Sequence, residues 1–170
     1  MERLKFKRKK FKILVLKIIF FVLGRALKGV SNFDKNVQNN ILKFPRPFII
    51  KLSLESEDIN LYLKKEDNRL KPVKQSDYSD FTIYFKDIET AFKLMTTQKR
   101  LDYGFSENRM NIKGDLTNAL IFTEILEYVQ TYLYPVFIVK SAIKKIPKIK
   151  IVNKIIVRIY LYFISIPFGI

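Results

Sequence analysis

Residues 108–115 read NRMNIKGD, and the largely apolar run LTNALIFTEILEYVQTYL follows at 116–133. The first part predicts a short strand at 110–112. Gly114 supplies a tight turn after it, because glycine adopts backbone angles that other residues avoid. Asp115 is then placed to cap the free N–H groups of a long helix from Leu116 to about Leu133. A strand that turns directly into a long apolar helix predicts a domain that mixes both kinds of element.

The predicted long helix is apolar over more than one narrow face. One stripe is widened by further apolar residues, so two interpretations stay open: dense core packing, or the lining of an apolar cavity. The stripe consists of Leu116, Ala119, Leu120, Leu126, Val129 and Leu133, widened by Ile121, Phe122, Ile125, Tyr128 and Tyr132.

Upstream of this stretch the hydrophobic period is two. Residues 48–54 and 59–64 alternate apolar and other side chains, which predicts a hairpin of two half-buried strands. The central part of 65–80 is a candidate third strand, and 81–85 predicts another.

Asp87 is a plausible N-cap for a short helix that ends around Thr97. Its apolar residues recur at helical spacing. After this helix, 101–105 and 110–112 are expected to form two further short strands, with a turn at 106–108 between them.

The formal net charge is +16, and the excess lies at the two ends of the chain. Residues 1–30 hold ten Lys/Arg and one Glu, and residues 136–170 hold seven Lys/Arg and no acid, while 31–135 hold fifteen of each sign. The pattern predicts a basic apolar membrane-associating segment at 1–30, a domain at 31–135 and a basic apolar membrane-associating tail at 136–170.

The N-terminal segment begins with cationic residues and continues as an apolar run at 13–23, which Lys17 interrupts. We expect a helix that ends near Gly24 or Gly29. The run is shorter than the about 20 apolar residues that span a bilayer, so a position in the membrane interface is favoured. A secretory signal is the alternative, because a basic start before a short apolar stretch is its general form, although no A-x-A site follows.

The C-terminal tail is expected to form two helical segments, because Pro147 interrupts it. Residues 159–170 carry no charge and include four aromatic residues, which suit the headgroup boundary of a membrane. A spanning helix at 151–170 is the alternative, although a central Lys or Arg costs roughly 3 kcal/mol there. The predicted membrane contacts at the two ends are Lys10, Lys17, Phe20, Phe21, Lys154, Arg158, Tyr160 and Phe163.

The stretch 80–133 resembles the SCP2 sterol-carrier-like family. The likeness rests on the strand ending at Phe85, the acidic helix start at Asp87, the apolar helix 91–95, and the strand of 108–115 that ends in Gly-Asp before the last main helix. The order of elements across 31–135 matches the family's α+β layout. Family members usually carry a glycine before the final strand, where this chain has Asn108. They usually carry another soon after the short helix, where it has Thr97-Gln98.

The resemblance implies a five-stranded, mostly antiparallel sheet covered by helices around an apolar tunnel. Such a tunnel accepts acyl chains, sterols or isoprenoid lipids without catalysis, and a prenylated quinone precursor is one candidate ligand. Gly114 and Asp115 are the predicted structural turn and cap. The residues expected to face the cavity, which are also candidates for ordinary core, are Phe81, Ile83, Phe85, Phe92, Met95, Leu116, Leu120, Ile121, Phe122 and Ile125.

Composition restricts the possible functions further. The chain has no cysteine and no histidine, which excludes disulfides, thiolate metal sites and Ser-His or Cys-His pairs. It contains no P-loop, G-x-S-x-G motif or metal-ligand cluster, so we expect no enzyme activity, cofactor or metal.

The expected partners are a lipid or other hydrophobic ligand and an anionic membrane surface, with the protein peripheral on the cytoplasmic, inner face. No nucleic acid is expected. The pI near 9.9 favours nucleic-acid binding. However, the basic residues at both ends are interleaved with apolar residues, which would have no apolar partner on a phosphate backbone. A basic nucleic-acid-binding protein and an integral membrane protein with a soluble α+β domain remain the alternatives, and oligomeric state is left open.

Overall fold

Five strands form one mixed sheet in this computed structural model, which describes residues 2–143, 146–147 and 149–169. The sheet order is β3-β2-β1-β4-β5. All neighbouring pairs are antiparallel except β1 and β4, which run parallel. The predicted α+β class with a mostly antiparallel five-stranded sheet is confirmed. The strands are β1 (Ile49–Leu54), β2 (Ile59–Glu66), β3 (Arg69–Val73), β4 (Phe81–Phe85) and β5 (Met110–Lys113).

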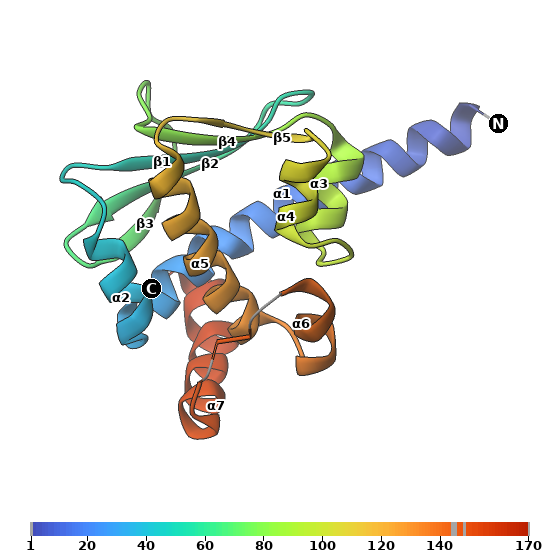
Figure 1. The fold of residues 1–170 in the computed structure, drawn as a ribbon. Coiled ribbons are helices and arrows are strands. Elements are labelled where there is room, and N and C mark those ends of the chain that lie inside the picture. Colours follow the sequence, from blue (N-terminus) through green and yellow to red (C-terminus); the bar gives the residue numbers. More distant parts are fainter. Residues whose placement is uncertain (1, 144–145, 148, 170) are drawn as a thin grey trace.

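Helices cover one face of the sheet (Figure 1). The predicted hairpin has its apolar residues on this face, where Leu52 of β1 stands opposite Leu61 of β2 and both are buried. This alternation is the period-two pattern of the sequence. The helices up to the end of the long apolar one are α1 (Glu2–Phe33), α2 (Lys35–Leu42), α3 (Ile88–Met95), α4 (Leu101–Ser106) and α5 (Leu116–Leu133).

Helix α1 is longer than expected, because it passes through both Gly24 and Gly29. Glycine commonly ends a helix, but here it permits close packing. A Cβ on Gly24 would lie 2.9 Å from Leu61 Cδ1, and one on Gly29 would lie 2.6 Å from Leu161 Cδ2. The predicted boundary at residue 30 therefore lies inside a helix that packs on the domain. The buried apolar side chains of α1 are Leu16, Phe20, Leu23, Ala26, Leu27 and Val30.

The prediction of a strand at 101–105 is wrong, because this segment is the short helix α4. A segment of only five residues does not distinguish helix from strand by its hydrophobic period. Two residues with positive φ delimit the region. They are Thr97, with a φ of 60°, and Asn108, with a φ of 52°. These are the two places where the resembled family usually carries glycine. Left-handed backbone is tolerated by Asn but is unusual for a β-branched residue such as Thr97.

The turn and caps predicted from the sequence are confirmed. Gly114 has φ of 120°, and Asp115 accepts a hydrogen bond from Thr117 N at 2.8 Å at the start of α5. Asp87 accepts from Thr90 N at 2.8 Å and so caps α3.

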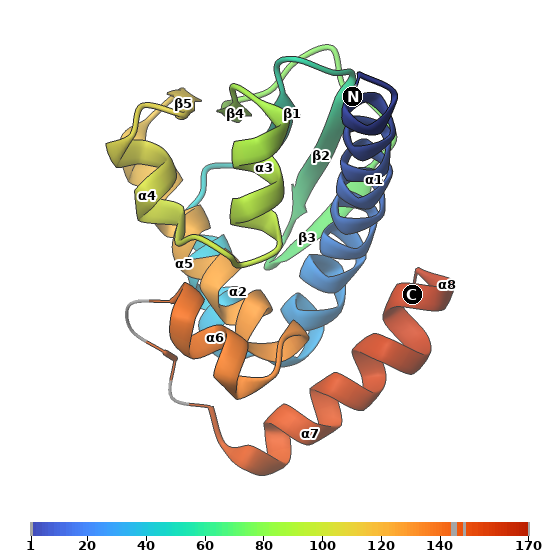
Figure 2. The same ribbon diagram turned by 90° about the vertical axis from the view of Figure 1, so that its right-hand side faces the viewer.

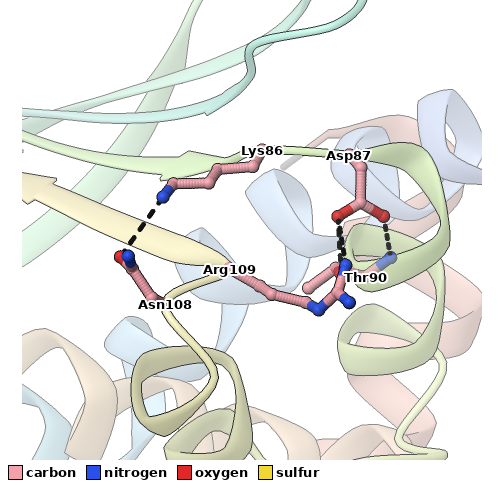
Figure 3. A network of polar contacts seen from close by, with 5 residues as sticks. All are labelled: Lys86, Asp87, Thr90, Asn108 and Arg109. Atoms are coloured by element: carbon pink, nitrogen blue, oxygen red, sulfur yellow. Dashed lines mark hydrogen bonds and ion pairs between the residues drawn. The ribbon is translucent and has the colours of Figure 1, made fainter.

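Asp87 also joins α3 to the sheet (Figure 3). Its carboxylate accepts from Thr90 Oγ1 at 2.9 Å and pairs with Arg109 at 3.3 Å, while Lys86 Nζ donates to Asn108 Oδ1 at 3.2 Å. Partial burial raises the pKa of Asp87, but the bonds from Thr90 and Arg109 outweigh it, so the net pKa is lowered. The carboxylate is thus held in its charged form as a structural cap.

The tail is divided as predicted, with α6 (Val136–Ala142) before Pro147 and a second helical run after it. That run comprises α7 (Ile151–Tyr160), a π-helical turn η1 (Leu161–Ser165) and α8 (Ile166–Phe168). It lies against the C-terminal half of α1 (Figure 2). By length and composition alone, Ile151–Phe168 is the one helical run in the described residues that is long and apolar enough to cross a membrane.

Four polar contacts fasten this run to α1, and in one of them Ser165 Oγ donates to Arg25 O at 3.0 Å. Arg25 donates to the carbonyl oxygens of Ile166 and Pro167, the second at 2.8 Å. Lys28 Nζ donates to Gly169 O at 2.6 Å. Cations at a helix C-terminus satisfy its free carbonyls and complement its dipole. The helical run that ends at Phe168, and Gly169 after it, are therefore attached to the domain.

Candidate functional site

A small apolar cleft lies where α1, α3 and α5 meet, with a volume of about 90 Å³. Helix α1 contributes four side chains, α3 contributes its last residue, and α5 and the residue after it contribute the rest. The lining residues are Ile18, Ile19, Val22, Leu23, Met95, Leu126, Gln130, Leu133 and Tyr134.

Tyr134 connects two walls of this cleft. Its hydroxyl donates to Met95 O at 3.0 Å, which ties the end of α5 to the end of α3. Burial raises the pKa of Tyr134, with a smaller contribution from Tyr162, so the phenol stays neutral. The cleft thus has fixed walls and no charged side chain among its lining residues.

The predicted cavity residues fall into three groups in the structure. Most belong to the core: Phe81, Ile83, Phe85, Phe122 and Ile125 are fully buried, and Phe92 and Ile121 are partly buried against them.

Dense packing accounts for the buried group. The rings of Phe81 and Phe122, for example, meet edge to face at 6.2 Å. Met95 does line the cleft. Leu116 and Leu120 lie near the start of α5 and are each 61% exposed. The structure therefore does not bring these two together with the rest.

The cleft residues of α1 were not anticipated as ligand-binding residues. The run 13–23 that contains them predicts a membrane segment equally well, because apolar side chains suit either role. Nothing in the sequence indicates that this N-terminal helix packs on α3 and α5. Only the tertiary contacts place it there.

The second helical run of the tail has an inverted distribution of polarity. Its outward face is apolar, and its cations lie toward the domain. Arg158 donates to Tyr132 O at 2.8 Å and to Tyr134 O, the free carbonyls at the end of α5. Burial, followed by the charge of Arg158, lowers the pKa of Lys154. The exposed apolar side chains are Ile151, Val152, Ile155, Ile156, Ile159, Tyr162, Phe163, Ile164 and Phe168.

Helix α1 carries a second exposed apolar stripe, formed by Phe11, Leu14, Ile18 and Phe21. Arg25 links it to the tail, because its guanidinium lies 4.1 Å from the centre of the Phe21 ring while it also donates to carbonyls of α8. The two exposed apolar surfaces are therefore neighbours. We call them together the apolar surface.

The predicted membrane contacts are distributed over both surface and interior. Lys10, Lys17, Phe21 and Phe163 are exposed. The other four are buried or half-buried. Phe20 is buried against Phe85, with ring centres 6.3 Å apart, because it faces the sheet. Tyr160 is half-buried and packs edge-on against Phe33, while Lys154 and Arg158 face inward.

Two larger hollows flank α7. One, of about 530 Å³, lies between the start of α2, the end of α5 and α7. It contains Asp34, whose carboxylate accepts from Asn36 N at 2.8 Å and from Tyr132 Oη at 2.6 Å. The other, of about 740 Å³, lies between the end of α5 and residues 146–158. Both combine lysine with apolar side chains.

Within the described residues, no group of three or more acidic, histidine or cysteine side chains is arranged to hold a metal ion.

No family model and no curated protein matches the sequence. Among solved structures, a ubiquinone synthesis protein described as UbiJ-SCP2 has a TM-score of 0.48 at 16% identity, covering 70% of this chain and 98% of its own. Sterol carrier protein 2 from Yarrowia lipolytica, in its apo form, has a TM-score of 0.46 at 19% identity, covering 64% and 87%. The sterol carrier protein-2 like-3 of Aedes aegypti has a TM-score of 0.35 at 15% identity, covering 54% and 90%. These structures are SCP2-domain proteins, the family that the sequence resembles.

Proposed function

We propose that this protein is a non-catalytic carrier that docks on a membrane surface and binds an apolar, lipid-like ligand. The observation that carries the proposal is the inverted polarity of the tail. An ordinary surface helix directs its charges to water, whereas Ile151–Phe168 directs them inward and leaves its apolar side chains exposed.

A membrane is the occupant that the charge of the chain favours for the apolar surface. Ten of the first thirty residues are Lys or Arg, and Lys10 and Lys17 among them are exposed on the same helix as the stripe of α1. Each basic residue near an anionic surface contributes about 1 kcal/mol, and burying an Ile or Phe side chain contributes roughly 1.5–3 kcal/mol. The two contributions act together. Because the cytoplasmic leaflet is the anionic one, the inner face of the membrane is the proposed location.

The ligand is proposed from the cleft between α1, α3 and α5. Its lining is almost wholly apolar, and Ile18 belongs both to the lining and to the exposed stripe of α1. A ligand can therefore pass between cleft and membrane without crossing water. The resemblance to the SCP2 family supports the same ligand class, which includes acyl lipids, sterol-like molecules and isoprenoid or quinone precursors.

Flotation with lipid vesicles tests the membrane part. The test variant is Ile155→Ser/Phe163→Ser, whose two side chains are 53% and 72% exposed. The matched control is Leu116→Ser/Leu120→Ser, in which both side chains are 61% exposed on α5. Circular dichroism establishes that all proteins are folded.

The wild type and the control should float with anionic vesicles. The test variant should bind tens to hundreds of times more weakly, because it loses about 2–4 kcal/mol of apolar burial. Equal flotation of the two variants would contradict the proposal, as would a wild type that shifts DNA in a gel but ignores the vesicles.

A spanning helix is the second candidate, since Ile151–Phe168 is long enough and apolar enough. It would place Lys154 and Arg158 in the hydrocarbon and separate Arg158 from the α5 carbonyls. Extraction with alkaline carbonate separates the two cases. A peripheral protein is released, and a spanning one stays in the membrane pellet.

A further inference from the structure

The side-chain amide of Gln130 has no hydrogen-bond partner among the described residues, although the residue is only 7% exposed. Its backbone carbonyl accepts from Tyr134 N at 2.9 Å, as in any helix end. Every other buried polar side chain among the described residues has a hydrogen-bond partner. Thr131, the next residue, donates to Glu127 O at 2.8 Å. Gln130 is therefore the exception in an otherwise satisfied interior.

The position of this amide indicates a role in the cleft. Gln130 lines the apolar cleft, and its polar atoms are not fully enclosed by protein. A buried amide without a partner destabilises the folded state. A site that binds an apolar molecule, in contrast, gains orientation from a single polar group among apolar walls.

We infer that Gln130 is the polar anchor of the cleft, and that the ligand is a neutral amphiphile with a carbonyl or hydroxyl oxygen on an apolar body. This inference rests on the proposed carrier function and specifies its ligand. The amide offers two N–H donors and one carbonyl acceptor, so it binds a ketone, quinone or ester oxygen by donation and a hydroxyl group in either direction.

The walls exclude charged head groups. No Lys, Arg, Asp or Glu lines the cleft, and the Tyr134 hydroxyl already donates to Met95 O. A carboxylate or phosphate brought into this space would lose its hydration without gaining a counter-charge. A free fatty acid or a phospholipid head group is therefore disfavoured against a neutral oxygen.

The size of the cleft indicates how the ligand lies. About 90 Å³ holds a head group and the first few carbons, not a whole lipid. Ile18 is half-exposed at the cleft and continues into the stripe of Phe11, Leu14 and Phe21. The oxygen end of the ligand lies at Gln130, and its apolar chain leaves along α1 toward the docked membrane.

Titrations followed by NMR with three ten-carbon probes test the inference: 2-decanone, 1-decanol and decanoate. The main variant is Gln130→Met, which keeps the length of the side chain and removes the amide. Gln75→Met, at an exposed glutamine in the loop after β3, is the matched control.

The wild type and the control should bind the ketone and the alcohol at least tenfold more tightly than decanoate at pH 8. Gln130→Met should lose about tenfold for the two neutral probes and little for decanoate. It should also unfold at a higher urea concentration than the wild type, because it replaces a largely buried amide that has no partner among the described residues with an apolar side chain. A purely structural glutamine would give the opposite change in stability.

Two results would overturn the inference in different ways. If the wild type binds all three probes equally and Gln130→Met binds like the wild type, the anchor is refuted while the carrier function stands. If the wild type binds none of them, the carrier function fails as well. Vesicle flotation of Gln130→Met should match the wild type in either case, because Gln130 lies outside the apolar surface.

Discussion

Replacing Tyr132 with Phe should weaken the connection between α5 and the start of α2. The Tyr132 hydroxyl donates to Asp34 Oδ2 at 2.6 Å, and the two residues are only 2% and 7% exposed. Asp34 also caps α2 by accepting from the backbone N–H groups of Asn36 and Val37. The substitution removes one oxygen and creates little empty space, so the loss is mainly that of a hydrogen bond to a buried carboxylate.

A hydrogen bond to a charged group contributes about 1.5–3 kcal/mol, so the free energy of unfolding should fall by roughly 2 kcal/mol. With a urea dependence on the order of 2 kcal/mol per molar, the midpoint of equilibrium unfolding should move down by about 1 M. Circular dichroism at pH 7 measures it. Tyr128→Phe is the control: this tyrosine lies one turn earlier on α5, and its hydroxyl has no hydrogen-bond partner among the described residues.

The pH dependence gives a second readout of the same contact. Burial, then the bond to Asp34, raises the pKa of Tyr132 well above its ordinary value. The unfolded chain ionises this phenol near pH 10 while the folded protein does not. The stabilisation is therefore complete below about pH 10 and is lost as the pH rises further, and Tyr132→Phe should lose less stability there than the wild type. A midpoint within 0.2 M of the wild type, or an equal loss in Tyr128→Phe, would refute the argument.

Three further predictions concern the local connections of the fold. Asp87→Ala should lower the free energy of unfolding by about 1 kcal/mol through loss of the cap. Because the pKa of Asp87 is lowered in the folded state, this difference should be present above about pH 4 and vanish as the pH falls through the folded pKa, as acid titration of stability would show. In an open helix, Gly29→Ala would raise the free energy of unfolding by about 1 kcal/mol. Here the new Cβ would lie 2.6 Å from Leu161 Cδ2 and from Ser165 Oγ, so we expect faster proteolysis of the tail. A rise in stability would contradict the close packing. Arg158→Met should lower the thermal midpoint by several degrees because the carbonyls at the end of α5 lose their donor, and an unchanged midpoint in calorimetry would show that water replaces it.

Much of the sheet and its caps follows from local sequence pattern. The period-two alternation of 48–54 and 59–64 is the register in which Leu52 faces Leu61, and Asp87 and Asp115 cap the helices that begin after them. The segment 101–105 is a helix and not the predicted strand, because five residues are too few for the hydrophobic period to separate the two.

The candidate site could be predicted less well from the sequence, because the same apolar residue types face a sheet, a ligand or a membrane. Of the predicted cavity residues, Met95 alone lines the cleft, while Phe81 and Phe122 pack against each other in the core. Gln130 had no distinguishing signal either. The role proposed for it depends on the absence of a side-chain partner among the described residues, which no spacing in the chain can indicate.

The sequence by itself determined the class of the domain, its turns and caps, and the concentration of positive charge at both ends, because these depend on residues close together in the chain. The tertiary structure decided what the ends do. Gly24 and Gly29 let α1 approach the sheet and the tail closely, so that half of an apolar segment became core and its other side stayed exposed. Burial depends on which distant residues meet, and here those contacts separate Phe20 in the interior from Phe21 on the surface, one residue apart.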